Sequence, residues 1–195
     1  MDHRINEIRR HVRGILEEHG SHGMDHTERV FSLCLAIGRE EDASLDVLLP
    51  AALLHDIARP LEKEKGLPHE REGARMAGEY LAAIGYSPEL IPAIQQAIRT
   101  HRFQSAEKPE SLEAQILSDA DKLDAMGAIG IARTFLRAGE HNGGIEDAVA
   151  HFHEKLLNLT TRMYTKTGQE IAAGRHAVLV RFLDDLTREL GHPPQ

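Results

Sequence analysis

Hydrophobic residues recur every three or four positions along most of the chain, which is the spacing of amphipathic helices. The first set is Ile5, Ile8, Val12 and Ile15, and its pattern ends near Gly20. Similar patterns predict further helices at about 25–37, 46–58, 68–84, 88–101, 112–138, 145–164 and 169–190. No segment alternates polar and apolar residues as a half-buried strand does. We therefore predict an all-α fold.

Individual residues indicate where some of these helices begin and end. Asp25, followed three residues later by Glu28, is typical of a capping pair that opens the second helix. Val47–Leu54 is almost entirely apolar, so the third helix is expected to be central and buried. Pro60 is expected to end this helix soon after Ala58.

The composition restricts the class of protein. The chain has 195 residues, enough for one domain with a sizeable core. Aromatic residues make up 4% and Trp is absent, which favours close helix packing of aliphatic side chains. The net charge is 23 − 31 = −8, so extended nucleic acid would be repelled. A small nucleotide remains compatible with that charge, provided that local cations or a metal ion hold its phosphates.

The cysteine count and the N-terminal sequence indicate the compartment. Cys34 is the only cysteine, which excludes an internal disulfide and a cysteine-rich zinc site, and we interpret it as a buried, inert thiol. The N-terminal MDHRINEIRR lacks the apolar core of a signal peptide. No stretch approaches the length of a membrane span. We expect a cytoplasmic protein.

A His-Asp pair, His55 and Asp56, ends the apolar third helix. Burying both groups is unfavourable unless a partner satisfies them. Since both are expected to border the inward face of one helix, each can give one ligand to a single ion. His26, four residues before Val30, is also expected to face the core, although a core or capping histidine would have the same pattern.

Three carboxylates lie close together in the segment SDADKLD. Asp121 follows Leu117 by four residues and precedes Ala125 by four, so it should share their inward direction. Asp119 and Asp124 belong to the same segment, and the three acids repel one another unless a cation or hydrogen bonds compensate. The alternative is a solvated acidic helix face.

The fragments DHTERV, LLHDIARP and SDADKLDAMGAIGIART resemble the motifs of the HD superfamily of phosphohydrolases. The resemblance extends to HFHEKLLNL and so covers nearly the whole chain, and it is nearest to small bacterial HD hydrolases that act on nucleotides. It implies an HD-domain helical bundle with a C-terminal helical extension. The expected organisation is one HD-type domain over 1–195, with its core at about 20–130 and the C-terminal helices at about 145–190.

In that family the first His, the His-Asp doublet and a later Asp bind one divalent metal. The resemblance therefore implies that His26, His55, Asp56 and Asp121 are the ligands, with Asp56 and Asp121 also taking part in catalysis. Asp121 is chosen because it matches the Asp of the family's "AD(K/R)L". Asp119 and Asp124 are then expected to orient ligands or a water.

Other residues are candidates for substrate or second-metal contacts. Relatives with two metals place extra histidines in segments comparable to those of His69 and His101, which are therefore candidates for a second ion or for phosphate; exposed histidines at helix ends are the alternative. Candidates for holding phosphate are Arg59, Lys122 and Arg29. We assign the other histidines to the surface or to packing: His3, His11, His19, His22, His141, His151, His153, His176 and His192.

The chain also departs from some branches of the family. Some nucleotidases and the guanosine-tetraphosphate hydrolases have an acidic residue three positions after the doublet's Asp, where this chain has Arg59. The identity of the general acid or base is thereby left open. The cyclic-di-GMP phosphodiesterases have a Gly-Tyr-Pro motif after a His pair, and this chain has neither in the right place. Its Gly85–Pro88 is only a turn.

The resemblance and the residues together predict a metal-dependent phosphohydrolase. A divalent ion would activate water to attack the phosphorus of a phosphate ester or anhydride, and nucleotides are the expected substrate class. Two imidazoles and two carboxylates favour Mn²⁺, with Fe²⁺, Co²⁺, Ni²⁺, Zn²⁺ and Mg²⁺ as alternatives. The competing hypothesis is a non-catalytic module that senses a metal or nucleotide. We expect no membrane partner, and the sequence leaves the oligomeric state open.

Overall fold

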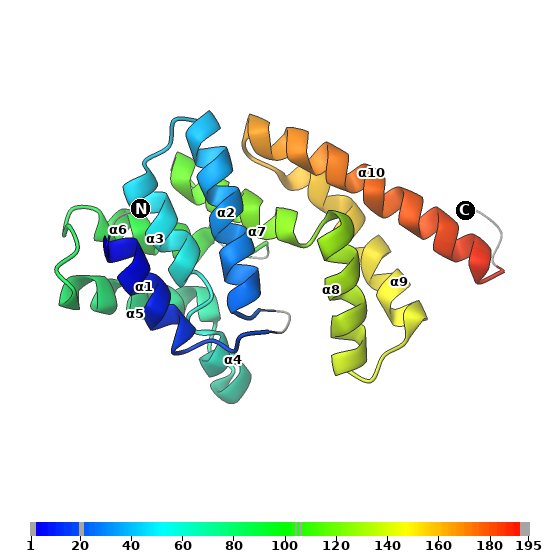
Figure 1. The fold of residues 1–195 in the computed structure, drawn as a ribbon, viewed down its shortest axis with the longest axis horizontal. Helices are drawn as coiled ribbons and strands as arrows, with labels where there is room; N and C mark the ends of the chain where they lie inside the picture. The colour runs from blue at the N-terminus through cyan, green and yellow to red at the C-terminus, as the bar shows by residue number, and fades with distance from the viewer. Residues whose placement is uncertain (1–2, 20–21, 104, 106, 192–195) are drawn as a thin grey trace. The chain divides into compact units, whose positions relative to one another are not determined.

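The computed structural model describes residues 3–19, 22–103, 105 and 107–191; His192 therefore lies outside the described residues. The helices are α1 (His3–Arg13), α2 (Met24–Glu40), α3 (Leu45–Leu54), α4 (Arg59–Lys65), α5 (His69–Ala83), α6 (Ile91–Thr100), α7 (Leu112–Asp124), α8 (Gly127–Glu140), α9 (Ile145–Glu154), the 3₁₀ helix η1 (Leu156–Arg162) and α10 (Lys166–Glu189) (Figure 1). No strand occurs in these ranges, and the predicted all-α class is confirmed.

The chain divides into two compact units, Met1–Asp121 and Lys122–Gln195. The boundary falls within α7, whose last residues belong to the second unit. In the first unit α3 packs against α1, α2, α5 and α6 (Figure 1). The single HD-type domain expected over 1–195 stays a prediction.

The third helix is buried along its apolar length, as expected. Every residue of Val47–Leu54 is buried, including Pro50 in the middle of the helix. Pro50 has no N–H to donate to the carbonyl of Asp46, one turn earlier. The Tyr86 hydroxyl donates to that carbonyl instead, at 2.7 Å. A proline is therefore accommodated in the central helix of this unit without leaving the carbonyl unpaired.

Two helix ends differ from the prediction. Helix α2 begins at Met24 with Gly23 as its N-cap, so Asp25 lies inside the first turn and is not the cap. A Cβ on Gly23 would approach the His19 carbonyl carbon to 2.7 Å, which explains a glycine at this position. Pro60 does not end the third helix; it lies in the first turn of α4, where its missing N–H has no helical acceptor.

The segment after α3 is a turn rather than more helix. Helix α3 ends at Leu54, and the turn 55–58 is closed by hydrogen bonds from Ile57 N to Leu54 O and from Arg59 N to Asp56 O, at 3.2 and 2.9 Å. His55 and Asp56 therefore belong to this turn. Arg59 begins α4 and so lies on a different helix from α3.

The second unit contains α8, α9, η1 and α10, with α10 packed on α8 and η1. The long helix predicted at 112–138 is broken between Asp124 and Gly127, because Gly127 has a positive φ of 67° that other residues rarely adopt. Three phenylalanine rings of the second unit form a cluster in which the ring centroids lie 5.8–6.2 Å apart: Phe135, Phe152 and Phe182.

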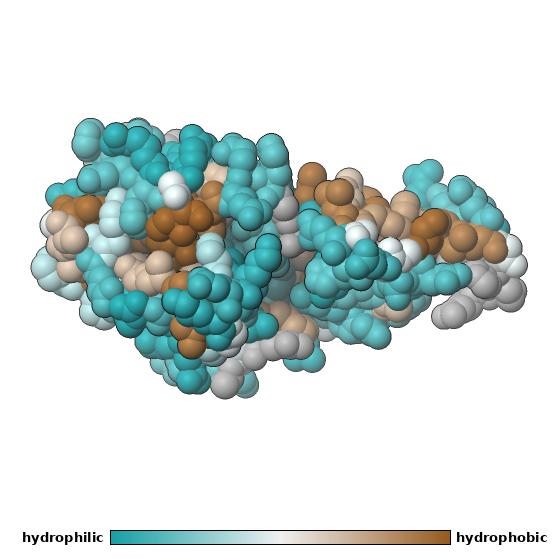
Figure 2. Space-filling model, turned by 90° about the horizontal axis from the view of Figure 1, so that it is seen from below, coloured by the Kyte–Doolittle hydropathy of each residue, from teal (hydrophilic) through white to brown (hydrophobic). Residues whose placement is uncertain are grey.

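The surface seen in Figure 2 is mainly hydrophilic, with separate apolar patches. The most exposed large apolar side chain of the described residues is Leu136, at 66%. Single exposed apolar residues are ordinary on protein surfaces. In the described ranges, no helix combines the length and the apolar character needed to cross a membrane.

Candidate metal centre

The four expected metal ligands lie together in the first unit. His26 lies in the first turn of α2, His55 and Asp56 in the turn after α3, and Asp121 near the end of α7. The Nε2 atoms of His26 and His55 are 3.2 Å apart, and His26 Nε2 is 3.4 Å from Asp121 Oδ1. Asp56 Oδ2 is 3.6 Å from each of these two nitrogens. Three of the side chains are buried, whereas that of Asp121 is 21% exposed.

The orientation of the His55 ring is fixed by the backbone. Its Nδ1 donates to the carbonyl of Ala52 at 2.8 Å, which leaves Nε2 as the acceptor nitrogen. His101 repeats this arrangement, with Nδ1 donating to Ile98 O at 2.6 Å. A backbone acceptor on one ring nitrogen is the usual support of a metal-binding histidine.

The two oxygens of Asp56 face different groups. Oδ2 faces His26 and His55, whereas Oδ1 accepts a hydrogen bond from Arg59 Nε at 2.8 Å. Oδ1 also lies 3.5 Å from His69 Nε2 and 3.7 Å from His101 Nε2. The Asp56 carboxylate therefore faces His26 and His55 with one oxygen and His69 and His101 with the other.

Burial and neighbouring charges set the protonation of the cluster. Burial lowers the pKa of the His55 imidazole to about 3, against an opposing influence of Asp56. Burial alone would raise the pKa of the Asp56 carboxyl, but His55 and Arg59 outweigh it and hold that pKa well below its usual value. The pKa of Asp121 is lowered in the same way, chiefly by His26. Neutral imidazoles and ionised carboxylates are the protonation states that ligate a metal.

Four groups of side chains in the described ranges place their donor atoms close enough together to hold a metal ion. Three of them share residues of this cluster: His22 with His26 and Asp56, His26 with His55 and Asp121, and His55 with Asp56 and His101. The fourth group is Glu62, His69 and Glu70. Two imidazoles and two carboxylates from three segments fit a divalent cation of the first transition row.

His69 and His101 are buried, at 0% and 1% exposure, so exposed helix-terminal histidines are the wrong interpretation. In the described part of the chain, His101 Nε2 has no hydrogen-bond partner. His69 Nδ1 lies 3.0 Å from Glu62 Oε2 without good hydrogen-bond geometry. Both rings border Asp56 Oδ1, and their binding of a second ion or of phosphate stays a prediction.

His22 is the residue of this cluster that the sequence analysis missed, because it was assigned to the surface or to packing. Its Nδ1 lies 3.1 Å from Asp56 Oδ2. Burial lowers the pKa of the His22 imidazole, while its contact with Asp56 raises it. The signal in the sequence was its position four residues before His26, but His22 precedes α2, so helical periodicity did not identify it.

The proposed phosphate contacts differ in their surroundings. Arg59 donates from Nε to Asp56 and from Nη1 to Glu62 Oε2, at 2.8 and 2.9 Å. Arg29 donates to Asp25 at 3.0 Å. Lys122 belongs to the second unit, where its ammonium lies 4.7 Å from the centre of the Tyr164 ring. Arg59 therefore contacts a candidate metal ligand, Asp56, directly.

The other two acids of the SDADKLD segment are both buried. Asp124 belongs to the second unit and accepts a hydrogen bond from Arg133 Nη1 at 2.7 Å. Asp119 and Asp121 both raise the pKa of the Cys34 thiol, after the larger effect of burial. That thiol is fully buried, as expected. Neither Asp119 nor Asp124 joins any of the four candidate metal groups in the described ranges.

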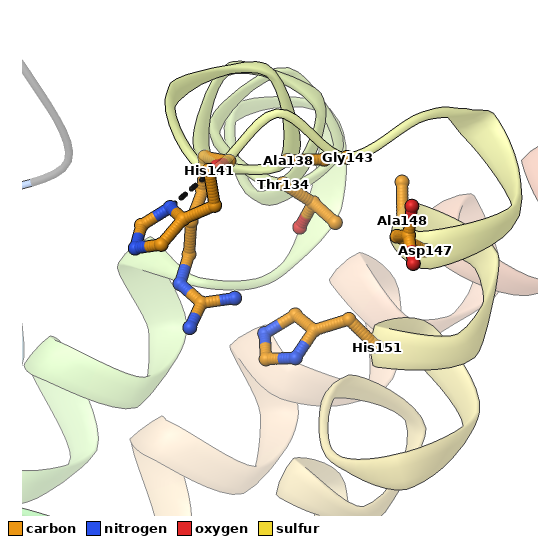
Figure 3. A pocket seen from close by; sticks show the side chains of 8 residues that line it. Thr134, Ala138, His141, Gly143, Asp147, Ala148 and His151 are labelled. Carbon is orange, nitrogen blue, oxygen red and sulfur yellow. Dashed lines mark hydrogen bonds between the residues drawn. The ribbon is translucent and has the colours of Figure 1, made fainter.

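A separate pocket in the second unit is lined by residues of α8, α9 and the loop between them (Figure 3). His141 donates from Nδ1 to Arg137 O at 2.8 Å, and Asp147 accepts from Gly144 N at 2.8 Å. In Figure 3 Asp147 lies at the opposite end of the pocket from His141. None of the proposed metal ligands lines this pocket.

The chain is similar to known proteins over most of its length. The profile of the HD domain matches residues 23–126. The chain is 34% identical to the uncharacterized protein YpgQ of Bacillus subtilis over 194 residues, covering 94% of this chain and 92% of YpgQ.

Several solved structures have a similar fold over nearly the whole chain. The crystal structure of B. subtilis YpgQ in complex with ADP has a TM-score of 0.80 at 31% identity, covering 95% of this chain and 97% of the other. An HD-superfamily hydrolase from Bacillus thuringiensis has a TM-score of 0.78 at 28% identity, covering 97% of this chain and 98% of the other. A predicted HD-superfamily hydrolase from an uncultured Thermotogales bacterium has a TM-score of 0.74 at 31% identity, covering 95% of this chain and 92% of the other. The chain belongs to the HD family.

Proposed function

We propose that this protein is a metal-dependent hydrolase of phosphate ester or anhydride bonds, with nucleotides as its substrate class. The main support is the meeting of His26, His55, Asp56 and Asp121 around one point in the first unit. His26 Nε2 lies 3.2–3.6 Å from His55 Nε2, Asp121 Oδ1 and Asp56 Oδ2, and His55 Nε2 lies 3.6 Å from Asp56 Oδ2. Without a cation, the ionised carboxylates of buried Asp56 and partly exposed Asp121 would lie close to the His55 imidazole, whose pKa burial lowers.

A divalent cation supplies a Lewis acid and lowers the pKa of bound water, and we propose that it is Mn²⁺. In this proposal His26 and His55 contribute nitrogen ligands, and Asp56 and Asp121 contribute oxygen ligands. The two carboxylates also accept hydrogen bonds from the attacking water and so orient it towards phosphorus. Arg59 fixes the Asp56 carboxylate by holding Oδ1, which keeps Oδ2 turned towards the two histidines.

Arg59 is the proposed phosphate-binding residue. Its Nε and Nη1 are occupied by Asp56 and Glu62, and Nη2 makes no hydrogen bond within the described part of the chain. The side chain is 21% exposed, so an incoming phosphate can reach it. An arginine whose position is fixed by two carboxylates donates to phosphate with little further loss of side-chain entropy.

The nucleotide assignment is supported by the relative crystallised with ADP, the B. subtilis YpgQ protein, at 31% identity. A substrate panel tests it directly. Mn²⁺-loaded protein is incubated with nucleoside triphosphates, nucleoside monophosphates, a phosphodiester and a phosphomonoester, and the products are resolved as phosphate, pyrophosphate or nucleoside monophosphate. We expect turnover of at least one nucleotide. Protein that binds metal and nucleotide without turnover of any of these substrates would instead be a binding module.

A further inference from the structure

His22 lies on the exposed side of the candidate metal cluster. Its side chain is 37% exposed, whereas His26 beside it is fully buried. The two rings meet edge to face, with centroids 5.5 Å apart and planes at 86°. His22 Nδ1 is 3.1 Å from Asp56 Oδ2, the same oxygen that faces His26 and His55. The ring therefore borders the position at which the other donor atoms meet.

The spacing of the donor atoms agrees with a shared ion. In an octahedral site, metal–donor distances of about 2.1–2.3 Å place neighbouring donors about 3.0–3.3 Å apart. The separation of 3.1 Å between His22 Nδ1 and Asp56 Oδ2 lies within that range. The separation of 3.2 Å between the Nε2 atoms of His26 and His55, two of the expected ligands, lies in the same range. His22, His26 and Asp56 also form one of the groups able to hold an ion.

A role for His22 only as a hydrogen-bond partner of Asp56 explains less of its position. Asp56 is already held through Oδ1 by Arg59, so its carboxylate does not depend on His22 for its orientation. His22 approaches Oδ2, the oxygen turned towards the histidines, rather than the oxygen on the Arg59 side.

We propose that His22 Nδ1 is a fifth protein ligand of the divalent ion in the substrate-free site. The inference rests on the proposed function, because it assumes the ion held by His26, His55, Asp56 and Asp121. Three imidazoles and two carboxylates then surround the ion, and one position is left for a water. His22 is the most exposed of these five ligands and the only one on the segment that precedes α2.

The test counts nitrogen ligands in the full-length protein. The protein is loaded with one equivalent of Mn²⁺, and pulsed electron paramagnetic resonance measures the couplings of ¹⁴N nuclei bound to the ion. We expect three coordinated imidazoles in the wild type. We expect two in His22→Asn, whose amide can still donate a hydrogen bond to Asp56. The dissociation constant of Mn²⁺ should rise at least about tenfold in this variant. His19→Asn, an exposed histidine three residues earlier, is the matched control and should keep three nitrogens.

The alternatives give different results. Two nitrogens in the wild type would overturn the role of His22 and leave the four-ligand site intact. An unchanged count in folded His22→Asn would also overturn it. Failure of the wild type to bind Mn²⁺ or another divalent ion would overturn both this inference and the proposed function. The wild-type count decides the question even if the variant does not fold.

Discussion

His26, on helix α2, and His55, in the turn after α3, bring their Nε2 atoms to within 3.2 Å of each other. Two imidazole nitrogens can face each other this closely when a proton or a cation lies between them. In the ion-free chain a neutral His26 can donate its Nε2 proton to His55 Nε2, while burial lowers the pKa of the His55 imidazole to about 3. A cation that also contacts Asp56 and Asp121 would satisfy both rings, and this is the basis of the predictions below.

Asp56→Ala should abolish hydrolysis, because it removes one metal ligand and one acceptor for the attacking water. The metal-stripped variant should stay folded, since Arg59 keeps its contact with Glu62 and is partly exposed to solvent. Activity assays and circular dichroism measure the two properties separately. Asp46→Ala, an exposed carboxylate at the start of α3, is the control and should retain wild-type activity. Substantial turnover by Asp56→Ala would remove this residue from the mechanism.

Arg59→Ala should lower kcat/KM by roughly tenfold to a hundredfold, or about 1.4–2.7 kcal/mol. The loss combines a missing phosphate contact with a less firmly held Asp56. Arg59→Lys should recover part of it, since a point charge attracts phosphate but cannot make two parallel hydrogen bonds. Lys63→Ala, an exposed cation on the same helix, serves as the control. If kinetics of Arg59→Ala stay within about twofold of wild type, the phosphate site must lie elsewhere, at Lys122, Arg29, His69 or His101.

The stability of the metal-stripped protein should fall as the pH decreases below the usual pKa of histidine. His55 has a pKa of about 3 in the folded chain, against 6.5 as its reference value. Between these values the unfolded chain binds more protons at this residue, so stability is present above pH 6.5 and is lost towards pH 3. Urea unfolding gives the free energy of unfolding at each pH. Between about pH 4.5 and pH 6, this free energy should rise with pH about 1.4 kcal/mol per pH unit more steeply in the wild type than in His55→Asn. Parallel slopes would mean that His55 does not titrate in this way.

The break between α7 and α8 should depend on Gly127. Its φ of 67° disfavours any residue with a Cβ, and that Cβ would lie 3.1 Å from the Arg175 Cγ. Gly127→Ala should therefore reduce the free energy of unfolding by about 1–2 kcal/mol. Gly174→Ala on α10 is the matched control, because nothing lies within 4 Å of its added Cβ. A helical glycine of this kind should gain up to about 1 kcal/mol on substitution. Equal stability of wild type and Gly127→Ala in urea would contradict the prediction.

The sequence predicted the fold class and the central helix because long apolar periodicities determine both. Val47–Leu54 is buried whatever the details of its ends. Helix ends were less predictable, since they depend on tertiary contacts such as the close approach of His19 to Gly23. Pro60 could end one helix or begin the next, and only the turn 55–58 distinguishes these possibilities.

The candidate site was predictable to the extent that its residues form motifs. His26, His55, Asp56 and Asp121 were expected from the family motifs, and their role as ligands stays a prediction. His22 was missed because it lies outside a helix, where periodicity gives no direction for its side chain. The pairing of Arg59 with both Asp56 and Glu62 was not predicted either, since it requires the chain to turn between α3 and α4.

The central claim is that His26, His55, Asp56 and Asp121 bind one divalent ion. Its most direct test is a crystal structure of the Mn²⁺-loaded protein, with the ion located by its anomalous scattering. We predict one strong anomalous peak about 2.0–2.4 Å from His26 Nε2, His55 Nε2 and a carboxylate oxygen of each aspartate. A peak bound by Asp119 or Asp124 in place of Asp121, or one found only at Glu62, His69 and Glu70, would contradict the account.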